Sequence, residues 1–322
     1  MNIFRLLGTA YRALAFFSLL APVSIALAAA PQLRTSAPGY YRMMLGDFEI
    51  TALSDGTVDL KMGELLTNTT AAKIQSALAK AYLKDPVEAS VNAYLINTGP
   101  KLVLIDAGAG NLFGPTLGRL LANLKASGYQ PEQVDEIYIT HLHADHVGGL
   151  IANNLIAFPN AIVRVDQRDA DFWLSKTNMD AAPKDAKPFF EGAMASINPY
   201  IAAGKFKSFN GNTDLLPGIK AVATRGHTPG HSIYVVESQG QRLVLWGDLM
   251  HAAAVQFPEP AVTIKFDTDS KAAAAQRKAQ YADAAKRGHW VAASHLPFPG
   301  IGHLRTAGKG YEFMPANYTA LR

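Results

Sequence analysis

The chain has 322 residues, 49% hydrophobic and 17% charged, a globular balance that excludes a disordered, collagen-like or coiled-coil protein. It contains no cysteine, which excludes disulfides, thiolate zinc cages and cysteine nucleophiles, so any metal must bind to histidine and carboxylate side chains. The net charge of +4 falls to +2 without Arg5 and Arg12 of the N-terminal segment, and such a nearly neutral chain is not expected to bind nucleic acid.

Residues 1–30 have the features of a Sec-type signal peptide. Two arginines precede an apolar stretch over residues 13–27, and an alanine-rich run ends at Ala30. The stretch is too short to cross a bilayer comfortably, which favours cleavage between Ala28 and Ala30 over membrane anchorage. We therefore expect a periplasmic or secreted protein in which residues 31–322 have no stable membrane anchor.

Past this leader, short apolar runs typical of strands alternate with stretches typical of helices, without an internal repeat. Asp55-Gly56 and Asn97-Thr98-Gly99 have the composition of hairpin turns. The order of elements favours two facing sheets with helices outside, in a single domain over residues 31–322. Strands are expected at residues 48–53, 90–97, 102–106, 134–140, 162–165, 219–224, 232–237, 243–246 and 290–293, and helices at 71–81, 115–126, 168–174, 190–202 and 270–286.

The strongest chemical signal is the segment Thr-His-Leu-His-Ala-Asp-His at residues 140–146, directly after an apolar strand. In an extended chain, side chains two positions apart point the same way, so His141 and His143 can hold one metal together. Asp145 and His146 follow where the chain turns, and they can serve a second metal. Imidazole and carboxylate groups are ligands that zinc and similar cations accept.

Two ligands per metal do not suffice, so further ligands are expected after later strands. His227, Asp248 and His295 are each the first strong ligand after an apolar run. They should converge on one rim of the sheets, because open α/β sites form at such rims.

The series H-x-H-x-D-H, H-T-P-G-H, G-D and a late S-H resembles the metallo-β-lactamase superfamily, in its form with a two-metal site, over roughly residues 40–315. The resemblance implies an α/β fold of the αββα sandwich type. Of the two histidines in H-T-P-G-H the family uses the first, so His231 is expected to support the loop. The implied ligands are His141, His143 and His227 for one metal, Asp145, His146 and His295 for the other, and Asp248 as the bridge.

Within this superfamily, residues 44–49, 53–58 and 293–303 resemble the methyl parathion hydrolase branch. That branch hydrolyses organophosphates and is related to enzymes that open lactones and esters, and its members are typically homodimers that bind zinc or similar metals. The resemblance places the following residues around the substrate pocket: Leu66, Phe113, Trp173, Phe189, His251, Ile264 and Phe266.

Four of these positions depart from methyl parathion hydrolase. Leu66, His251, Ile264 and Phe266 stand where we expect that enzyme to have Arg, Leu, Thr and Leu. A bulkier, more apolar pocket without the arginine favours an aryl lactone or ester over a phosphotriester.

The sequence therefore predicts a two-metal hydrolase that opens lactones and aryl esters such as dihydrocoumarin, with weak phosphotriesterase activity. A metal-bridging hydroxide would attack the carbonyl carbon, and Asp248 would fix the metal spacing and accept a proton. Zinc is the favoured metal, although manganese, cobalt or iron also suits such ligands. Asp106 is expected to support the site, and His251 to form pocket wall, without binding metal.

The expected partner is a small lactone or ester, and the resemblance implies a homodimer. Two alternatives remain open at this point. One is a true organophosphate hydrolase of the methyl parathion type, and the other is a metal-stabilised binding protein on the same fold.

Overall fold

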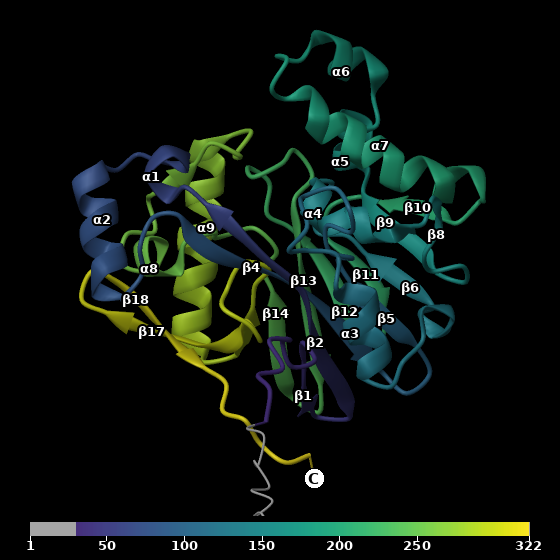
Figure 1. Cartoon of the computed structure of the whole chain (residues 1–322), viewed down its shortest axis with the longest axis horizontal. Helices are drawn as coiled ribbons and strands as arrows, with labels where there is room; N and C mark the ends of the chain where they lie inside the picture. Colours follow the sequence, from purple (N-terminus) through teal and green to yellow (C-terminus); the bar gives the residue numbers. More distant parts are fainter. Residues whose placement is uncertain (1–29, 322) are drawn as a thin grey trace, which may run out of the picture. The chain divides into compact units, whose positions relative to one another are not determined.

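The computed structural model describes residues 30–321 (Figure 1). The predicted leader lies outside these residues except for Ala30, so it stays a prediction, as does the single domain assigned to residues 31–322. Residues 37–322 cluster as one compact unit by themselves. Within the described residues, no helix combines the length and the apolar character needed to cross a membrane.

Two seven-stranded sheets make up most of the described fold, and both mix parallel and antiparallel pairs. In order across the first sheet lie β1 (Tyr40–Leu45), β2 (Phe48–Leu60), β4 (Val87–Asn97), β5 (Leu102–Ile105), β6 (Glu136–Tyr138), β9 (Ile162–Asp166) and β10 (Phe206–Phe209). In order across the second lie β11 (Thr213–Leu216), β12 (Ile219–Ala223), β13 (Ser232–Ser238), β14 (Gln241–Leu245), β16 (Trp290–Ala292), β17 (Ile301–Ala307) and β18 (Gly310–Pro315). Two-stranded pairs are formed by β3 (Leu66–Thr67) with β15 (Thr263–Ile264), and by β7 (Ile151–Ala152) with β8 (Leu155–Ile156).

The inner strands are apolar on both faces, which places them between two buried layers. In β5, Val103 and Ile105 face the core between the sheets, whereas Leu102 and Leu104 belong to the core under the helices of the first sheet. The second sheet alternates in the same way. The predicted sandwich of two mixed sheets with helices outside is confirmed.

Helices cover the outer face of each sheet (Figure 1). The core of the first sheet includes residues of α3 (Leu120–Ala126), α5 (Gln167–Trp173) and α7 (Lys187–Ala202), and that of the second includes α9 (Ser270–Arg287). The remaining helices are short or peripheral. They are α1 (Met62–Leu65), α2 (Ala71–Lys80), α4 (Ala144–Val147), α6 (Lys176–Ala181), α8 (Ala253–Gln256) and the 3-10 turns Pro131–Gln133 and Gly148–Leu150.

One turn prediction is right and the other is wrong. Thr98 closes a tight turn between the antiparallel strands β4 and β5 by donating to Lys101 O at 2.9 Å. Asp55-Gly56, by contrast, forms a bulge inside β2, which continues to Leu60. The bulge carries the Asp55 carboxylate into the protein, where it is fully buried.

The buried Asp55 carboxylate also shortens the helix predicted at residues 115–126. It accepts backbone N–H groups from Ala109, Gly118 and Leu120 at 2.9, 3.0 and 3.0 Å. These bonds hold residues 109–119 as a loop with Gly118 at a φ of +81°, so α3 begins only at Leu120.

The bulge requires a residue without a side chain at position 56. The φ of Gly56 is +128°, and an added Cβ would lie 2.1 Å from Thr116 O. We expect Gly56→Ala to lower the free energy of unfolding by about 2–4 kcal/mol, from backbone strain plus overpacking. Gly99→Ala is the control, since Gly99 has a φ of +90° with nothing within 4 Å of an added Cβ, and it should cost about 1 kcal/mol. Equal losses in urea denaturation would contradict the packing account.

Candidate metal centre and pocket

Five of the seven predicted ligands follow the carboxyl ends of strands, and the other two, Asp145 and His146, lie in α4 just beyond β6. His141 and His143 follow β6, His227 follows β12, Asp248 follows β14 and His295 follows β16. The structure therefore brings together side chains from four separate segments.

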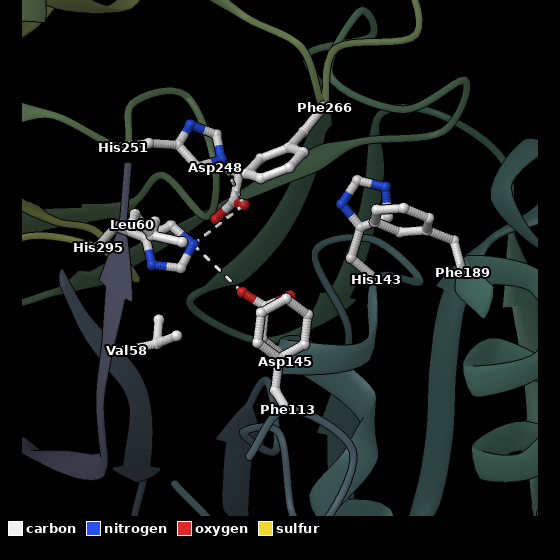
Figure 2. A pocket seen from close by; sticks show the side chains of 10 residues that line it. All are labelled: Val58, Leu60, Phe113, His143, Asp145, Phe189, Asp248, His251, Phe266 and His295. Carbon is white, nitrogen blue, oxygen red and sulfur yellow. Dashed lines mark hydrogen bonds and ion pairs between the residues drawn. The ribbon is translucent and has the colours of Figure 1, made fainter. Parts of the chain in front are cut away.

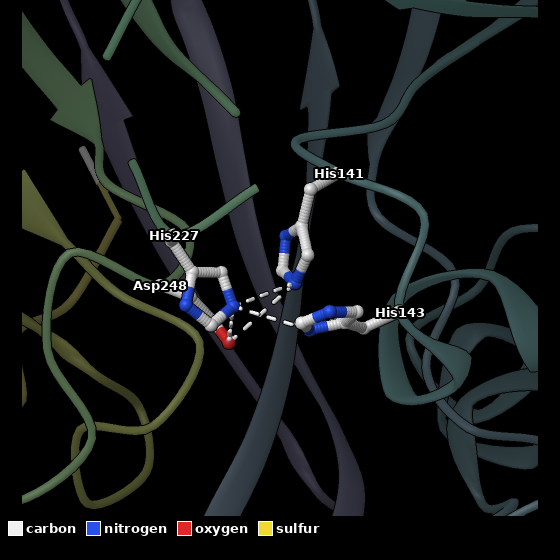
Figure 3. Close-up of side chains that lie close together, drawn as sticks. All are labelled: His141, His143, His227 and Asp248. Carbon is white, nitrogen blue, oxygen red and sulfur yellow. Dashed lines mark hydrogen bonds and ion pairs between the residues drawn. The ribbon is translucent and has the colours of Figure 1, made fainter. Parts of the chain in front are cut away.

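The first group consists of three imidazoles and one carboxylate (Figure 3). The Nε2 atom of His227 lies 3.2 Å from both His141 Nε2 and His143 Nδ1. Asp248 Oδ2 lies 3.3 Å from His227 Nε2 and 3.6 Å from His141 Nε2. These four donor atoms surround a single point, as the ligands of one cation do.

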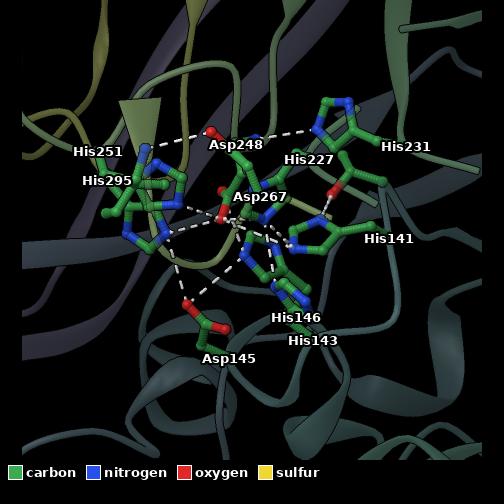
Figure 4. Close-up of polar contacts among 12 residues, drawn as sticks. His141, His143, Asp145, His146, His227, His231, Asp248, His251, Asp267 and His295 are labelled. Carbon is green, nitrogen blue, oxygen red and sulfur yellow. Dashed lines mark hydrogen bonds and ion pairs between the residues drawn. The ribbon is translucent and has the colours of Figure 1, made fainter. Parts of the chain in front are cut away.

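The second group shares Asp248 and adds Asp145, His146 and His295 (Figure 4). His146 Nε2 lies 3.2 Å from Asp248 Oδ1, and His295 Nε2 lies 3.2 Å from Asp248 Oδ2. Asp145 Oδ2 lies 3.5 Å from His146 Nε2 and 3.4 Å from His295 Nε2. The chain enters α4 directly after His143. This change of direction turns the side chains of Asp145 and His146 toward Asp248 and His295, the other members of the second group.

This arrangement fits two divalent cations. Among the described residues, His146 Nε2 and Asp248 Oδ1 are buried without a well-aligned hydrogen bond, although they lie 3.2 Å apart. Burying such polar atoms is costly unless something binds them. Burial alone would raise the pKa of Asp248, but the surrounding histidines hold it well below its usual range. The carboxylate is therefore ionised at neutral pH, in the state that binds a metal.

Further polar groups hold the outward-facing nitrogens of these histidines. Asp106 Oδ2 lies 2.8 Å from His146 Nδ1 and also accepts the Thr140 hydroxyl at 2.9 Å. Asp106 therefore contacts the ring of His146 on the side away from Asp248, in the supporting position that was expected. His295 Nδ1 lies 2.9 Å from Ser90 O, the carbonyl to which it can donate. Such contacts fix the ring orientation and the tautomer.

His231 supports the loop, as expected. Its Nδ1 lies 2.8 Å from the Thr224 hydroxyl, and its Nε2 accepts the backbone N–H of Asp248 at 3.1 Å. Burial lowers the pKa of His231 to about 3, so the ring is neutral and able to accept that bond. His231 thereby fixes the backbone of the carboxylate shared by both groups.

Two carboxylates that support the site were not predicted from the sequence. Asp267 Oδ1 lies 2.9 Å from His227 Nδ1, and Asp169 accepts the backbone N–H groups of Leu142 and Gly230 at 2.9 and 2.6 Å. Asp169 thus ties the two loops that carry the first group. Neither residue belongs to a sequence motif. Asp267 follows β15 and Phe266, and Asp169 lies in the helix that follows β9, and these positions are the only signals in the sequence that could have indicated a supporting role.

A pocket opens over the second group (Figure 2). Its walls come from β2, the loop before α3, the start of α7 and the segment after Asp248. Among the lining residues there is no lysine or arginine, and the only acidic ones are two of the predicted ligands. The lining consists of Val58, Leu60, Phe113, His143, Asp145, Phe189, Asp248, His251, Phe266 and His295.

Four of the seven predicted pocket residues line this pocket: Phe113, Phe189, His251 and Phe266. Leu66, Trp173 and Ile264 do not. Leu66 and Ile264 pair across β3 and β15 and are buried behind the wall. The Trp173 ring lies 5.2 Å from that of His143, in the core beneath it.

Val58 and Leu60 line the pocket but were not predicted to. Both alternate along the part of β2 beyond the bulge. That part of the strand was missed because Asp55-Gly56 was interpreted as a turn.

His251 forms part of the pocket wall, as expected. Its Nε2 lies 3.0 Å from Asp248 Oδ2.

The model of the Metallo-beta-lactamase superfamily matches residues 87–290, more than half of the chain. The chain belongs to the metallo-beta-lactamase superfamily. An N-acyl homoserine lactonase of Bacillus cereus is 28% identical to this superfamily member over 171 residues, which are 47% of this chain and 60% of the lactonase. A second N-acyl homoserine lactonase, from a Bacillus species, is 27% identical over 54% of this chain and 68% of its own length.

Solved structures resemble this superfamily member over more of its length. The hydrolase AbOPH of the beta lactamase superfamily is 41% identical, with a TM-score of 0.85 over 89% of this chain and 100% of AbOPH. AidC, a dizinc quorum-quenching lactonase in complex with the product N-hexanoyl-L-homoserine, is 27% identical, with a TM-score of 0.81 over 88% of this chain and 99% of AidC.

The contact between Asp267 and His227 predicts a selective loss of metal affinity. We expect Asp267→Ala to weaken binding of one of two cations about 10- to 100-fold, because His227 loses the partner that orients its ring. Asp267→Asn should lose less, since its amide oxygen can still accept the Nδ1–H. Zinc competition against a chromogenic chelator measures both, with Asp180→Ala on exposed α6 as the control. Unchanged affinity for both cations in Asp267→Ala would contradict the assignment.

Proposed function

We propose that this protein is a two-metal hydrolase that opens lactones and aryl esters, with weak activity on phosphotriesters. The observation that carries the proposal is an aromatic pocket that has no lysine or arginine in its lining and lies directly over the histidine and aspartate cluster. A neutral ring fits such a pocket, since the aromatic walls bury apolar surface. A substrate with an exposed carboxylate would find no lysine or arginine among the lining residues.

The likeness to lactonases supports the same substrate class. We further propose that the chain falls in the methyl parathion hydrolase branch, on the motifs of residues 44–49, 53–58 and 293–303. A homodimer and a periplasmic location are also kept as proposals, on the resemblance and on residues 1–30.

The proposed cations are zinc ions held by His141, His143 and His227, by Asp145, His146 and His295, and by Asp248 in both groups. When bound, such cations supply Lewis acidity, which lowers the pKa of water and polarises a carbonyl oxygen.

The remaining steps belong to the chain. Water adds to the carbonyl carbon, and Asp248 accepts the proton that this addition releases. The carboxyl then returns this proton to the ring oxygen as the C–O bond breaks. The products are an alcohol or phenol and a carboxylic acid, which releases its proton to water at neutral pH.

The aromatic walls orient the substrate during these steps. Ring centroids lie 5.1 Å apart for His143 and Phe189, 6.4 Å for Phe189 and Phe266, and 5.9 Å for Phe266 and His251. The four rings thus line a continuous side of the pocket. Burial lowers the pKa of His251 to about 4 although Asp248 opposes the shift, so His251 is a neutral group at working pH.

The organophosphate alternative draws on the same pocket, because a phosphotriester is also neutral and carries an aryl group. The departures at Leu66, His251, Ile264 and Phe266 argued against it. Leu66 and Ile264 lie behind the wall, so only His251 and Phe266 change the lining of this pocket relative to the one expected in methyl parathion hydrolase.

A substrate panel tests the proposal. Residues 31–322, loaded with zinc, cobalt or manganese, should hydrolyse dihydrocoumarin, an acyl-homoserine lactone and phenyl acetate with higher kcat/KM than methyl paraoxon. Asp248→Ala should lose at least about 100-fold in kcat, since both groups lose a shared donor.

The outcomes separate the hypotheses. Activity confined to paraoxon would establish the organophosphate alternative and leave the metal centre intact. Metal-loaded protein that is inert to the whole panel would favour a binding protein instead. Full activity in Asp248→Ala would contradict the two-metal mechanism.

A further inference from the structure

The segment of residues 249–267 forms one wall of the pocket and is joined to the metal centre at both ends. It begins directly after Asp248, and it ends at Asp267, which contacts His227. Between these ends it carries His251 and Phe266, both of which line the pocket. The conformation of this segment therefore sets the positions of the His251 and Phe266 side chains in the pocket wall.

Gln256 ties the two halves of this segment together. The side chain is fully buried, and its Oε1 accepts the backbone N–H groups of His251 at 2.7 Å and Ala252 at 3.0 Å. Its Nε2 donates to Val262 O at 3.1 Å. One side chain thus fixes the backbone of His251 relative to the stretch that leads to Phe266.

Arg277 holds the same segment from outside. It lies on α9, is fully buried, and has no salt bridge within the described part of the chain. Its Nε donates to Leu249 O, and its Nη1 donates to Pro260 O at 3.2 Å and Val262 O at 2.6 Å. All three acceptors belong to residues 249–267.

A buried charge without an ion-pair partner is costly, so its compensation by carbonyl groups matters to the fold. The planar guanidinium can reach several carbonyls at once, which the single ammonium of lysine cannot do in the same geometry. Removing the guanidinium would take a donor from three carbonyl groups of one segment, of which Val262 O would keep only the Gln256 amide. The effect should therefore concentrate in that segment.

On the basis of the proposed hydrolase function, we propose that Arg277 and Gln256 are positioning residues that fix residues 249–267 and thereby limit the size of substrate that the pocket accepts. Neither side chain lines the pocket or belongs to the ligand groups. They act through the backbone positions of His251 and Phe266. A loosened wall should admit bulkier acyl groups and orient small ones less well.

The matched variants are Arg277→Met and Arg287→Met, two arginines of the same helix. Arg287 is exposed and pairs with Asp283, so its loss controls for removing an arginine from α9. Arg277→Lys keeps the positive charge but loses the planar group that reaches several carbonyls. Gln256→Met removes the amide that bonds to His251, Ala252 and Val262. These two variants keep the test available if Arg277→Met does not fold.

Two readouts are measured on the zinc-loaded protein. In hydrogen exchange, Arg277→Met should speed exchange across residues 249–267 while residues 141–146 keep the wild-type rate. In kinetics, the ratio of kcat/KM for phenyl octanoate to that for phenyl acetate should rise about tenfold, mainly through KM. Arg277→Lys should fall between wild type and Arg277→Met, Gln256→Met should shift both readouts in the same direction, and Arg287→Met should match wild type.

The positioning role is overturned if Arg277→Met and Gln256→Met exchange like wild type at residues 249–267, or if the ratio stays within twofold of Arg287→Met. A variant that only lowers the melting temperature also overturns it. If the wild type hydrolyses neither ester, the proposed function fails, whereas the exchange data still decide whether the two residues hold the segment.

Discussion

The carboxylate of Asp248 is the constraint around which the described fold is arranged. Both of its oxygens face histidines, and it belongs to both ligand groups. A charge in this position is stable only if positive or hydrogen-bonding groups surround it, since burial disfavours an isolated carboxylate. The two sheets provide that surrounding by ending their strands on one rim, so that ligands from both sheets meet there.

Support for this centre extends through the interior in layers. His231 holds the backbone of Asp248, Asp106 holds His146, and Asp267 holds His227. Each contact uses a nitrogen that does not face the centre. The ligand rings are therefore oriented before any cation binds, which lowers the cost of forming the site.

Local pattern was sufficient to predict two facing sheets and the candidate ligand side chains, whereas the division of those ligands into two groups was implied by the resemblance to the metallo-β-lactamase superfamily. Apolar runs mark the inner strands, and the first strong ligand after each run lies at its end. The β2 bulge could not be predicted in this way. Asp55-Gly56 has the composition of a turn, and only the distant N–H groups of residues 109–120 make it a bulge.

The pocket was harder to predict than the ligands for a related reason. Whether a side chain lines a cavity depends on which face of a short strand it occupies, and the pairing of Ile264 with Leu66 turns both away. Asp267 lies three residues after Ile264, yet its contact with His227 requires the whole conformation of residues 249–267. Such positions follow from tertiary structure and not from local composition.

The division of the pocket walls among separate segments has an evolutionary consequence. The end of β2, the loop of residues 109–119 and the start of α7 contribute walls but none of the clustered donors. Insertions and deletions in these three places can reshape selectivity while the chemistry persists. Residues 249–267 are different, because they are anchored at both ends to the centre. Divergence among relatives should therefore appear as length changes in the first three places and as point substitutions in the fourth.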